Sequence, residues 1–426
     1  MPGRRHKKNA PSVTELERLV IEDLGARGDG IGRAGGTAIH VPFTAPGDVI
    51  SAAWRDGRWQ ATAFHEQSDM RRAPPCRFCG TCGGCALQHI TPEAYQQFKF
   101  DRLVGLAENA GLDSEIIQPM ISCPIASRRR ALFALRRRGG KNIFGFHERA
   151  SRAIVDIDEC MVLAPQLSSA MPRLRDLGDV LLKFFPAVNM QVTVCETGLD
   201  LHLTGDVHAD DLTYDARESI ADAARVAGAA RISLHSELIA MFSEPIIRFG
   251  ELAVVLPPGG FLQASLEGEA ILTRLVLEAC EGAKFCADLF CGCGTFSAPL
   301  SVRATVLAID AEMPAIEALR NACAAQNRGD RIKVEKRNLF RDPLVVQELS
   351  SFEVVVFDPP RAGAEAQANA LSTSDVPTIV GVSCNPVTFL RDALILQAGG
   401  YRLETLTPID QFIYSPHLEM VGVFKR

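Results

Sequence analysis

Apolar runs alternate with helical patterns through the last third of the chain. The pattern predicts strands at 284–290, 304–309, 331–337, 352–357, 377–383, 401–406 and 418–425, and helices at 295–302, 312–326 and 386–398. Strands that alternate with helices form a doubly wound sheet of mostly parallel strands. We therefore predict an α/β domain in residues 256–426, with its ligands at the carboxyl ends of the strands.

The N-terminal part has a different pattern. Short β-type runs, broken by glycine, occur at 13–16, 28–32, 38–42 and 48–52. Short strands at this spacing are typical of a small barrel of the OB type, which we place at residues 12–67, after a basic tail at 1–11. Residues 68–255 begin with a connector rich in proline and cysteine. A helix at 92–110 and strands near 131–135 and 153–157 then predict a mixed α+β central domain.

Length and composition fit a water-soluble protein of several domains. A chain of 426 residues is too long for one core, and its 47% hydrophobic and 23% charged residues are ordinary values. No uninterrupted apolar run reaches eighteen residues, so we expect no membrane span. The basic start is not followed by an apolar segment, which argues against a secretory signal and for a cytoplasmic protein.

Charge is distributed unevenly. The net charge is −6, yet residues 127–152 hold nine cations against one acid, Glu148. Such a local patch can bind a phosphate backbone whatever the global charge. Phe133, Phe144 and Phe146 lie between the cations and could stack on bases. The alternative is a solvated charged face. The nine cations are Arg128, Arg129, Arg130, Arg136, Arg137, Arg138, Lys141, Arg149 and Arg152.

A glycine pair follows the first strand of the α/β domain. Gly292 and Gly294 stand between this strand and the next helix, where backbone can pass close to a ligand and amides point at it. Neither a dinucleotide fingerprint nor a P-loop is present, so another adenosine ligand is favoured. Asp310 ends the second strand, where its carboxylate can accept both ribose hydroxyls. Asp310 could also act as a helix N-cap.

Chemistry-bearing residues follow two further strands. Asp358 lies in Asp-Pro-Pro-Arg after one strand, and Cys384 in Ser-Cys-Asn-Pro after the next. If the final strand runs antiparallel, its start places His417 and Glu419 beside Cys384. A lone cysteine at a strand end is more often a core residue, and Glu419 could be an exposed edge charge.

Together these side chains suit methylation of uracil at C5. A thiolate that adds to C6 makes C5 a strong enough nucleophile to attack a sulfonium methyl group. A base must then remove the C5 proton before the thiolate can leave. Cys384 and Glu419 are the candidates for these two roles. Gln263 and Asp358 can bind the polar edge of the base.

Four cysteines at equal spacing predict a metal site. Cys76, Cys79, Cys82 and Cys85 lie three residues apart, a density that disulfides do not explain in a cytoplasmic protein. Four thiolates can hold zinc. Alternatively, three of them and a remote ligand can hold an iron–sulfur cluster, for which Cys160 is the natural candidate.

In combination, these motifs resemble the bacterial RNA uracil-5-methyltransferase family, and in particular its 23S ribosomal-RNA branch, over nearly the whole chain. The resemblance implies a TRAM domain at 12–67, a Rossmann-like methyltransferase domain and S-adenosylmethionine as cofactor. It implies Cys384 as nucleophile and Glu419 as base. The implied ligands of a [4Fe-4S] cluster are Cys76, Cys82, Cys85 and Cys160, with Cys79 as an extra cysteine. The implied residues of the cofactor and base sites are Gln263, Phe290, Gly292, Gly294, Asp310 and Asp358.

Alternatives remain open at this point. By analogy with the family, ribosomal RNA is favoured over transfer RNA as the partner. The protein is expected to be a monomer. Cytosine-5 methylation uses the same thiolate chemistry with a different cysteine loop. A non-catalytic iron–sulfur protein that binds RNA would need neither Cys384 nor Glu419.

Overall fold

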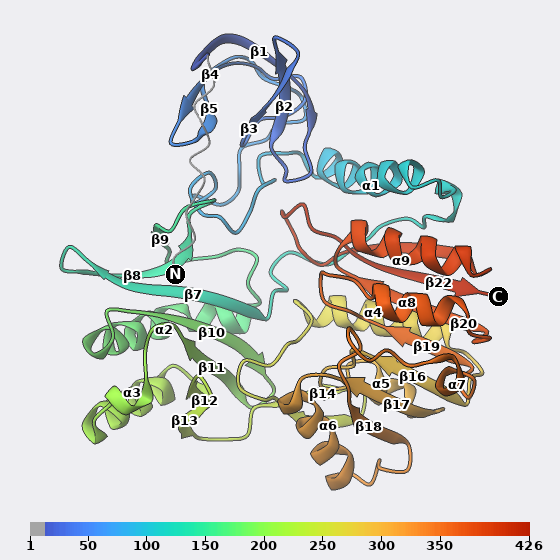
Figure 1. Ribbon diagram of the computed structural model, residues 1–426. Coiled ribbons are helices and arrows are strands. Elements are labelled where there is room, and N and C mark those ends of the chain that lie inside the picture. The colour runs from blue at the N-terminus through green and yellow to red at the C-terminus, as the bar shows by residue number, and fades with distance from the viewer. Residues whose placement is uncertain (1–12) are drawn as a thin grey trace. The chain divides into compact units, whose positions relative to one another are not determined.

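The computed structural model describes residues 13–426, so the predicted basic tail lies outside the described residues (Figure 1). Contacts divide the chain into two compact units. The first unit comprises residues up to Leu103, His147–Ala153 and Tyr414–Pro416. The second comprises Val104–Phe146, Ile154–Ile413 and His417–Arg426.

The first unit contains a five-stranded antiparallel sheet and the larger part of a helix, α1, whose last turns belong to the second unit. Its strand order is β3-β2-β1-β4-β5, and β3 also contacts β5, so the sheet curls on itself. Alternate residues of the strands, including Leu19, Ile21 and Ile50, form its core. This confirms the predicted N-terminal β domain. The elements are β1 (Glu15–Leu24), β2 (Gly30–Ala34), β3 (Thr37–Val41), β4 (Val49–Arg55), β5 (Arg58–Glu66) and α1 (Pro92–Asn109).

A seven-stranded sheet forms the first part of the second unit. Its order is β13-β12-β11-β10-β7-β8-β9, and two helices pack on it. The helices are α2 (Pro165–Phe184) and α3 (Tyr214–Val226). The strands are β7 (Arg130–Arg138), β8 (Lys141–His147), β9 (Ile154–Asp156), β10 (Ala187–Cys195), β11 (Gly198–Thr204), β12 (Ala229–Leu234) and β13 (Glu237–Met241).

Two phenylalanines of the basic region belong to this core. Phe133 and Phe144 are 0% and 2% exposed, and their rings stack on each other with centroids 4.5 Å apart. Phe146 stacks on Phe133 at 5.1 Å. The interpretation that Phe133 and Phe144 stack on bases is therefore wrong, because both rings are buried. Phe146 is partly exposed, and its stacking on bases stays a prediction. Arg129 is also buried and pairs with Glu269, so it is no part of a surface patch.

An eight-stranded sheet forms the rest of the second unit (Figure 1). Its order is β18-β17-β16-β19-β20-β22-β21-β6. Neighbouring strands from β18 to β20 are parallel, while β22 runs antiparallel to β20. This confirms the predicted α/β fold and the reversed final strand. The strands are β6 (Ile121–Ser122), β16 (Phe285–Leu289), β17 (Thr305–Asp310), β18 (Ile332–Lys336), β19 (Val354–Phe357), β20 (Thr378–Ser383), β21 (Arg402–Asp410) and β22 (Glu419–Lys425).

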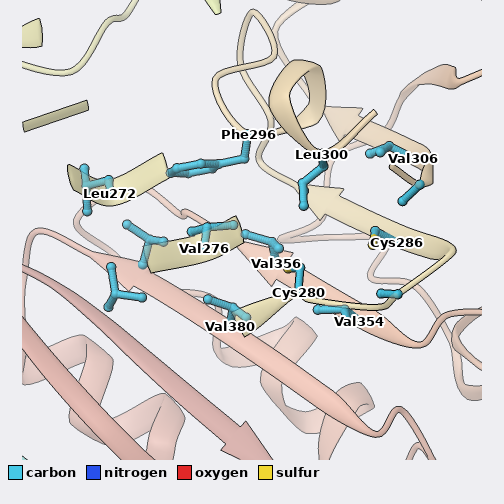
Figure 2. Packing of buried hydrophobic residues seen from close by; sticks show 14 of the residues in the cluster. Leu272, Val276, Cys280, Cys286, Phe296, Leu300, Val306, Val354, Val356 and Val380 are labelled. Atoms are coloured by element: carbon cyan, nitrogen blue, oxygen red, sulfur yellow. The ribbon is translucent and has the colours of Figure 1, made fainter. Parts of the chain in front are cut away.

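Helices cover both faces of this sheet. On one face, Leu272 and Val276 of α4 and Leu300 of α5 pack against Cys286 and Val306 (Figure 2). On the other face, α9 packs on β20 and α8 packs on α9. The helix predicted at 295–302 is only four residues long. The helices are α4 (Leu266–Ala279), α5 (Ser297–Leu300), α6 (Met313–Ala325), α7 (Val346–Leu349), α8 (Glu365–Ser372) and α9 (Pro386–Ala398).

Smaller elements connect the two sheets of the second unit. A hairpin of β14 (Ile246–Phe249) and β15 (Leu252–Val255) packs on α6. Two 3-10 turns lie at Ser114–Ile116 and Ala209–Asp211.

Among the helices of residues 13–426, none combines the length and the apolar character that crossing a membrane requires.

Candidate active site

The glycine loop leaves β16 in a backbone conformation that favours glycine. Gly292 and Gly294 have φ angles of +54° and +99°, and a Cβ at Gly294 would lie 2.7 Å from the Leu319 side chain. Phe290 has φ +63°, which is strained for a residue with a bulky side chain. Such strain persists where the surroundings impose it, often at ligand sites. The loop therefore has the conformation expected of a ligand cradle.

Asp310 contacts this loop from the end of β17. Its carboxylate accepts hydrogen bonds from Gly292 N at 2.9 Å and Glu312 N at 2.8 Å. The N-cap of α6 is Glu312, so the alternative role of Asp310 as the helix N-cap is wrong. Each carboxylate oxygen has a second lone pair, which leaves Asp310 able to accept further hydrogen bonds.

Asp288 is a further acid at this end of the sheet, which the sequence patterns did not indicate. It is fully buried and accepts a 2.5 Å hydrogen bond from the Ser297 hydroxyl. Burial, with smaller contributions from Asp358 and Asp310, raises its pKa to about 7. An acid inside an apolar strand was the signal that could have identified it.

Cys384 follows β20 in a loop that Asn385 stabilises. The Asn385 side chain accepts a hydrogen bond from Val387 N at 3.2 Å, and its amide donates to Arg361 O at 2.9 Å. The loops after β19 and β20 are thus tied together. Ser383 pairs with Met420, and continuing this antiparallel register by one residue sets position 384 opposite position 419.

Glu419 is the first residue of β22 and only 3% exposed, so the alternative of an exposed edge charge is wrong. Its carboxylate accepts a 2.8 Å hydrogen bond from the Gln411 amide, which also donates to Gln263 Oε1 at 2.9 Å. Gln263 in turn donates to Asp358 Oδ2 at 3.2 Å. Two amides therefore link the two carboxylates. Sequence patterns did not indicate Gln411, which follows the last residue of β21.

The ionisable groups of this cluster have raised pKa values. Burial and the nearby Asp358 raise the pKa of Glu419 to about 8, although a hydrogen bond from Gln411 acts to lower it. Burial raises the pKa of Asp358 to about 7. Burial and the negative charges of Glu419 and Asp358 raise the pKa of Cys384 to about 11, although the positive charge of Arg361 acts to lower it. At neutral pH the Cys384 thiol and most of Glu419 are protonated.

His417 contacts Arg361 and Phe412. It is exposed, its Nδ1 lies 3.1 Å from the guanidinium of Arg361, and its ring packs edge-on against Phe412 at 6.1 Å. The structure thus brings together Cys384, Glu419, Gln263 and Asp358, with the glycine loop on the same sheet edge.

Comparison with known proteins defines the family. Residues 270–426 match the model of the tRNA (uracil-5-)-methyltransferase family. An uncharacterized RNA methyltransferase of Caulobacter vibrioides is 42% identical, over 96% of this chain and 100% of that protein. The 23S rRNA (uracil(1939)-C(5))-methyltransferase of Chromohalobacter salexigens is 30% identical, over 96% of this chain and 89% of that protein. The chain belongs to the RNA (uracil-5-)-methyltransferase family.

The fold also matches a solved structure. The tRNA (uracil-54, C5)-methyltransferase of Pyrococcus abyssi, in complex with S-adenosyl-L-homocysteine, superposes with a TM-score of 0.72. The match covers 96% of this chain and 99% of that chain at 24% identity. This RNA (uracil-5-)-methyltransferase therefore shares its fold with that enzyme.

The cysteine-rich segment of this RNA (uracil-5-)-methyltransferase folds into consecutive turns. Cys79 N donates to Cys76 O at 3.1 Å, and Cys82 N to Phe78 O at 2.9 Å. The cysteines from Cys76 to Cys85 form no disulfide, are partly exposed and belong to the first unit, whereas Cys160 belongs to the second. Among the side chains of residues 13–426, no group of three or more potential ligands is gathered around one point. The donor set itself, closely spaced thiols, suits zinc or an iron–sulfur cluster.

Proposed function

We propose that this protein methylates C5 of a uridine in RNA, with Cys384 as the covalent nucleophile and Glu419 as the base. The observation that carries the proposal is the register of β20 and β22, which sets position 384 opposite Glu419 at the edge that holds the glycine loop. A thiol and a carboxylate at this position are what addition at C6 and proton removal from C5 require.

Addition begins when the thiol of Cys384 loses its proton to solvent water. The thiolate forms a bond to C6, and the electron pair of the C5–C6 double bond moves toward O4. Gln263 and Asp358 bind the polar edge of the base, where a protonated Asp358 can donate a hydrogen bond to O4. With a pKa of about 11 before substrate binds, Cys384 needs a positive charge nearby to ionise at neutral pH.

S-adenosylmethionine supplies the electrophilic methyl group and, with its sulfonium, such a positive charge. Phe290, Gly292, Gly294 and Asp310 would hold its adenosine part. The loop fits an adenosine ligand because its backbone conformation allows close approach and Asp310 keeps free acceptor positions for ribose hydroxyls.

Once C5 has gained the methyl group, Glu419 removes the C5 proton. The electrons of that bond restore the double bond, and the thiolate of Cys384 leaves.

We further propose 23S ribosomal RNA as the substrate. The relative named as a 23S rRNA enzyme aligns over 96% of this chain at 30% identity, which favours it over the structural neighbour named as a tRNA enzyme. Mass mapping of 5-methyluridine in both RNA classes, from cells with and without the protein, tests this. Loss of 5-methyluridine from transfer RNA alone would overturn the proposal that ribosomal RNA is the substrate.

For the cysteine-rich segment we propose a [4Fe-4S] cluster held by Cys76, Cys82, Cys85 and Cys160. Soft thiolate ligands are its chemical requirement. The β domain at 12–67 would serve as a TRAM domain that binds RNA, and the protein would act as a monomer. Iron and sulfide analysis of protein purified without oxygen distinguishes the cluster from zinc.

Removing the nucleophile should abolish methyl transfer. Cys384→Ala is expected to lower the rate of 5-methyluridine formation by at least about 10³-fold, because C5 is not activated without a bond at C6. The rate is measured by transfer of labelled methyl groups to RNA. Cys323→Ala, at a buried cysteine of α6, serves as the control and should leave the rate nearly unchanged. Methyl transfer by Cys384→Ala at the rate of the control would overturn the covalent mechanism.

Removing the base should trap the intermediate. Glu419→Gln keeps an acceptor for Gln411 but cannot take the C5 proton, so a covalent protein–RNA adduct that carries the methyl group should accumulate. Denaturing gels with labelled methyl groups detect it. The exposed Glu281→Gln is the matched control and should show no adduct beyond the wild-type level. Equal adduct in both variants contradicts the role of Glu419.

A further inference from the structure

The loop between β21 and β22 leads directly to Glu419. Its ends belong to the second unit, but its middle, Tyr414–Pro416, belongs to the first unit. We call these three residues the tether. Glu419 follows the last tether residue by only three positions.

Every polar group of Tyr414 has a partner in the first unit. Its carbonyl accepts hydrogen bonds from Ala86 N at 2.8 Å and Leu87 N at 3.1 Å. Its backbone N donates to the hydroxyl of Tyr95 in α1 at 3.0 Å. Its own hydroxyl accepts a bond from the guanidinium of Arg72 at 3.1 Å. Four hydrogen bonds therefore restrain this one loop residue.

Conformation and packing support the same conclusion. Tyr414 is 5% exposed and has φ +60°, a left-handed conformation that a tyrosine adopts only when its surroundings compensate for the strain. Its ring packs against that of Tyr95 with centroids 5.9 Å apart. Arg102 of α1 donates to Pro416 O at 2.7 Å, which fixes the other end of the tether.

We propose that Tyr414 is a positioning residue, through which the cysteine-rich segment and α1 hold the stretch of chain that carries Glu419. Ala86 directly follows Cys85, so any group bound to Cys85 also fixes the two amides that hold Tyr414 O. The proposal rests on the proposed role of Glu419 as the base. Loosening the tether should slow removal of the C5 proton, while addition of Cys384 and methyl transfer, which do not use Glu419, continue.

Tyr95→Phe and Tyr414→Phe test the proposal. Tyr95→Phe removes the acceptor of Tyr414 N, and Tyr414→Phe removes the acceptor of Arg72. Tyr401→Phe is the matched control: Tyr401 is equally buried, and its hydroxyl donates to Val376 O within the α/β domain. In both tether variants, amide hydrogen exchange in residues 411–419 should be faster by about 10-fold or more.

The second measurement follows the RNA. During turnover, the tether variants should hold several times more enzyme as methylated covalent adduct than Tyr401→Phe does. Their single-turnover rate of methyl transfer should stay within about 2-fold of that control, a division between steps that a mere loss of stability would not produce.

Each outcome decides a separate point. Exchange as slow as in the control would overturn the tether itself. Faster exchange with control levels of adduct, while Glu419→Gln does trap adduct, would overturn the positioning role. A Glu419→Gln enzyme that traps no adduct counts against the proposed function, and hydrogen exchange then still decides whether the tether restrains residues 411–419.

Discussion

At the scale of single residues, the candidate active site is a group of acids in surroundings that disfavour charge. Asp358 and Glu419 share one hydrogen-bonded network, and burial raises the pKa of each to about 7 and about 8. Each negative charge also opposes the other, so such a pair retains a proton at neutral pH. The network is therefore able to exchange a proton with a bound base in the physiological range.

This predicts a pH dependence of adduct breakdown. Glu419 acts as a base only when ionised, and its raised pKa keeps it protonated until about pH 8. Decay of the methylated adduct should therefore speed up about 10-fold per pH unit below that value and level off above it. Quenched-flow sampling from pH 6 to pH 9 measures the decay. A rate that does not change over this range would contradict ionisation of Glu419.

Most site residues could be recognised from sequence because they lie in short motifs at strand ends. Cys384 and Asp358 directly follow apolar strands, and parallel topology brings such ends together. Gln411 was not recognised, because its importance depends on lying between Gln263 and Glu419, which are 148 and 8 residues away. No local pattern contains that relation.

At the scale of elements, a buried ion pair connects the start of β7 with the start of α4. Arg129 donates to Glu269 at 2.5 Å, and both side chains are less than a tenth exposed. Arg129 also donates to Gln263 O at 3.1 Å, and its backbone N donates to Ala264 O. The pair thus supports the backbone on which Gln263 reaches Asp358.

Breaking this pair on one side should be costly. Glu269→Leu is expected to lower the free energy of unfolding by about 3–5 kcal/mol, because the guanidinium of Arg129 stays buried without a counter-charge. Glu269→Leu combined with Arg129→Met should recover most of the loss. Urea unfolding measures both changes. The control is Arg274→Ala, which removes an exposed ion pair with Glu278 and is expected to lower the free energy of unfolding by less than about 1 kcal/mol. A double variant as unstable as the single one would contradict this account.

Prediction of elements succeeded where apolar periodicity was strong. The strands and long helices after residue 284 agree with the structure to within a few residues, apart from β21, which continues to Asp410. Other elements lack such a signal. The second half of β5 is exposed and shows no alternation, and β6 is two residues long and is a strand only because it pairs with β21. Tertiary pairing, which local pattern does not encode, defines both.

At the scale of the whole molecule, the chain crosses between units more often than contiguous domains allow. The predicted boundaries at 67 and 255 treat each domain as one stretch of sequence. The first unit instead includes His147–Ala153 and Tyr414–Pro416. Segments that join a distant unit show no periodicity or change in composition at their ends. Domain boundaries predicted from sequence therefore do not detect them. The predicted domains stay a prediction.

The distribution of the first unit along the chain has a consequence for biosynthesis. Tyr95 and its partner Tyr414 are 319 residues apart. At about 5–20 residues per second, the ribosome needs roughly 15–60 s to make the intervening chain. Throughout that interval, the nascent helix α1 and the residues after Cys85 have polar groups without their final partners. The first unit to be synthesised is thus completed only as the last residues emerge, and a chaperone would have the whole of that time to act on it.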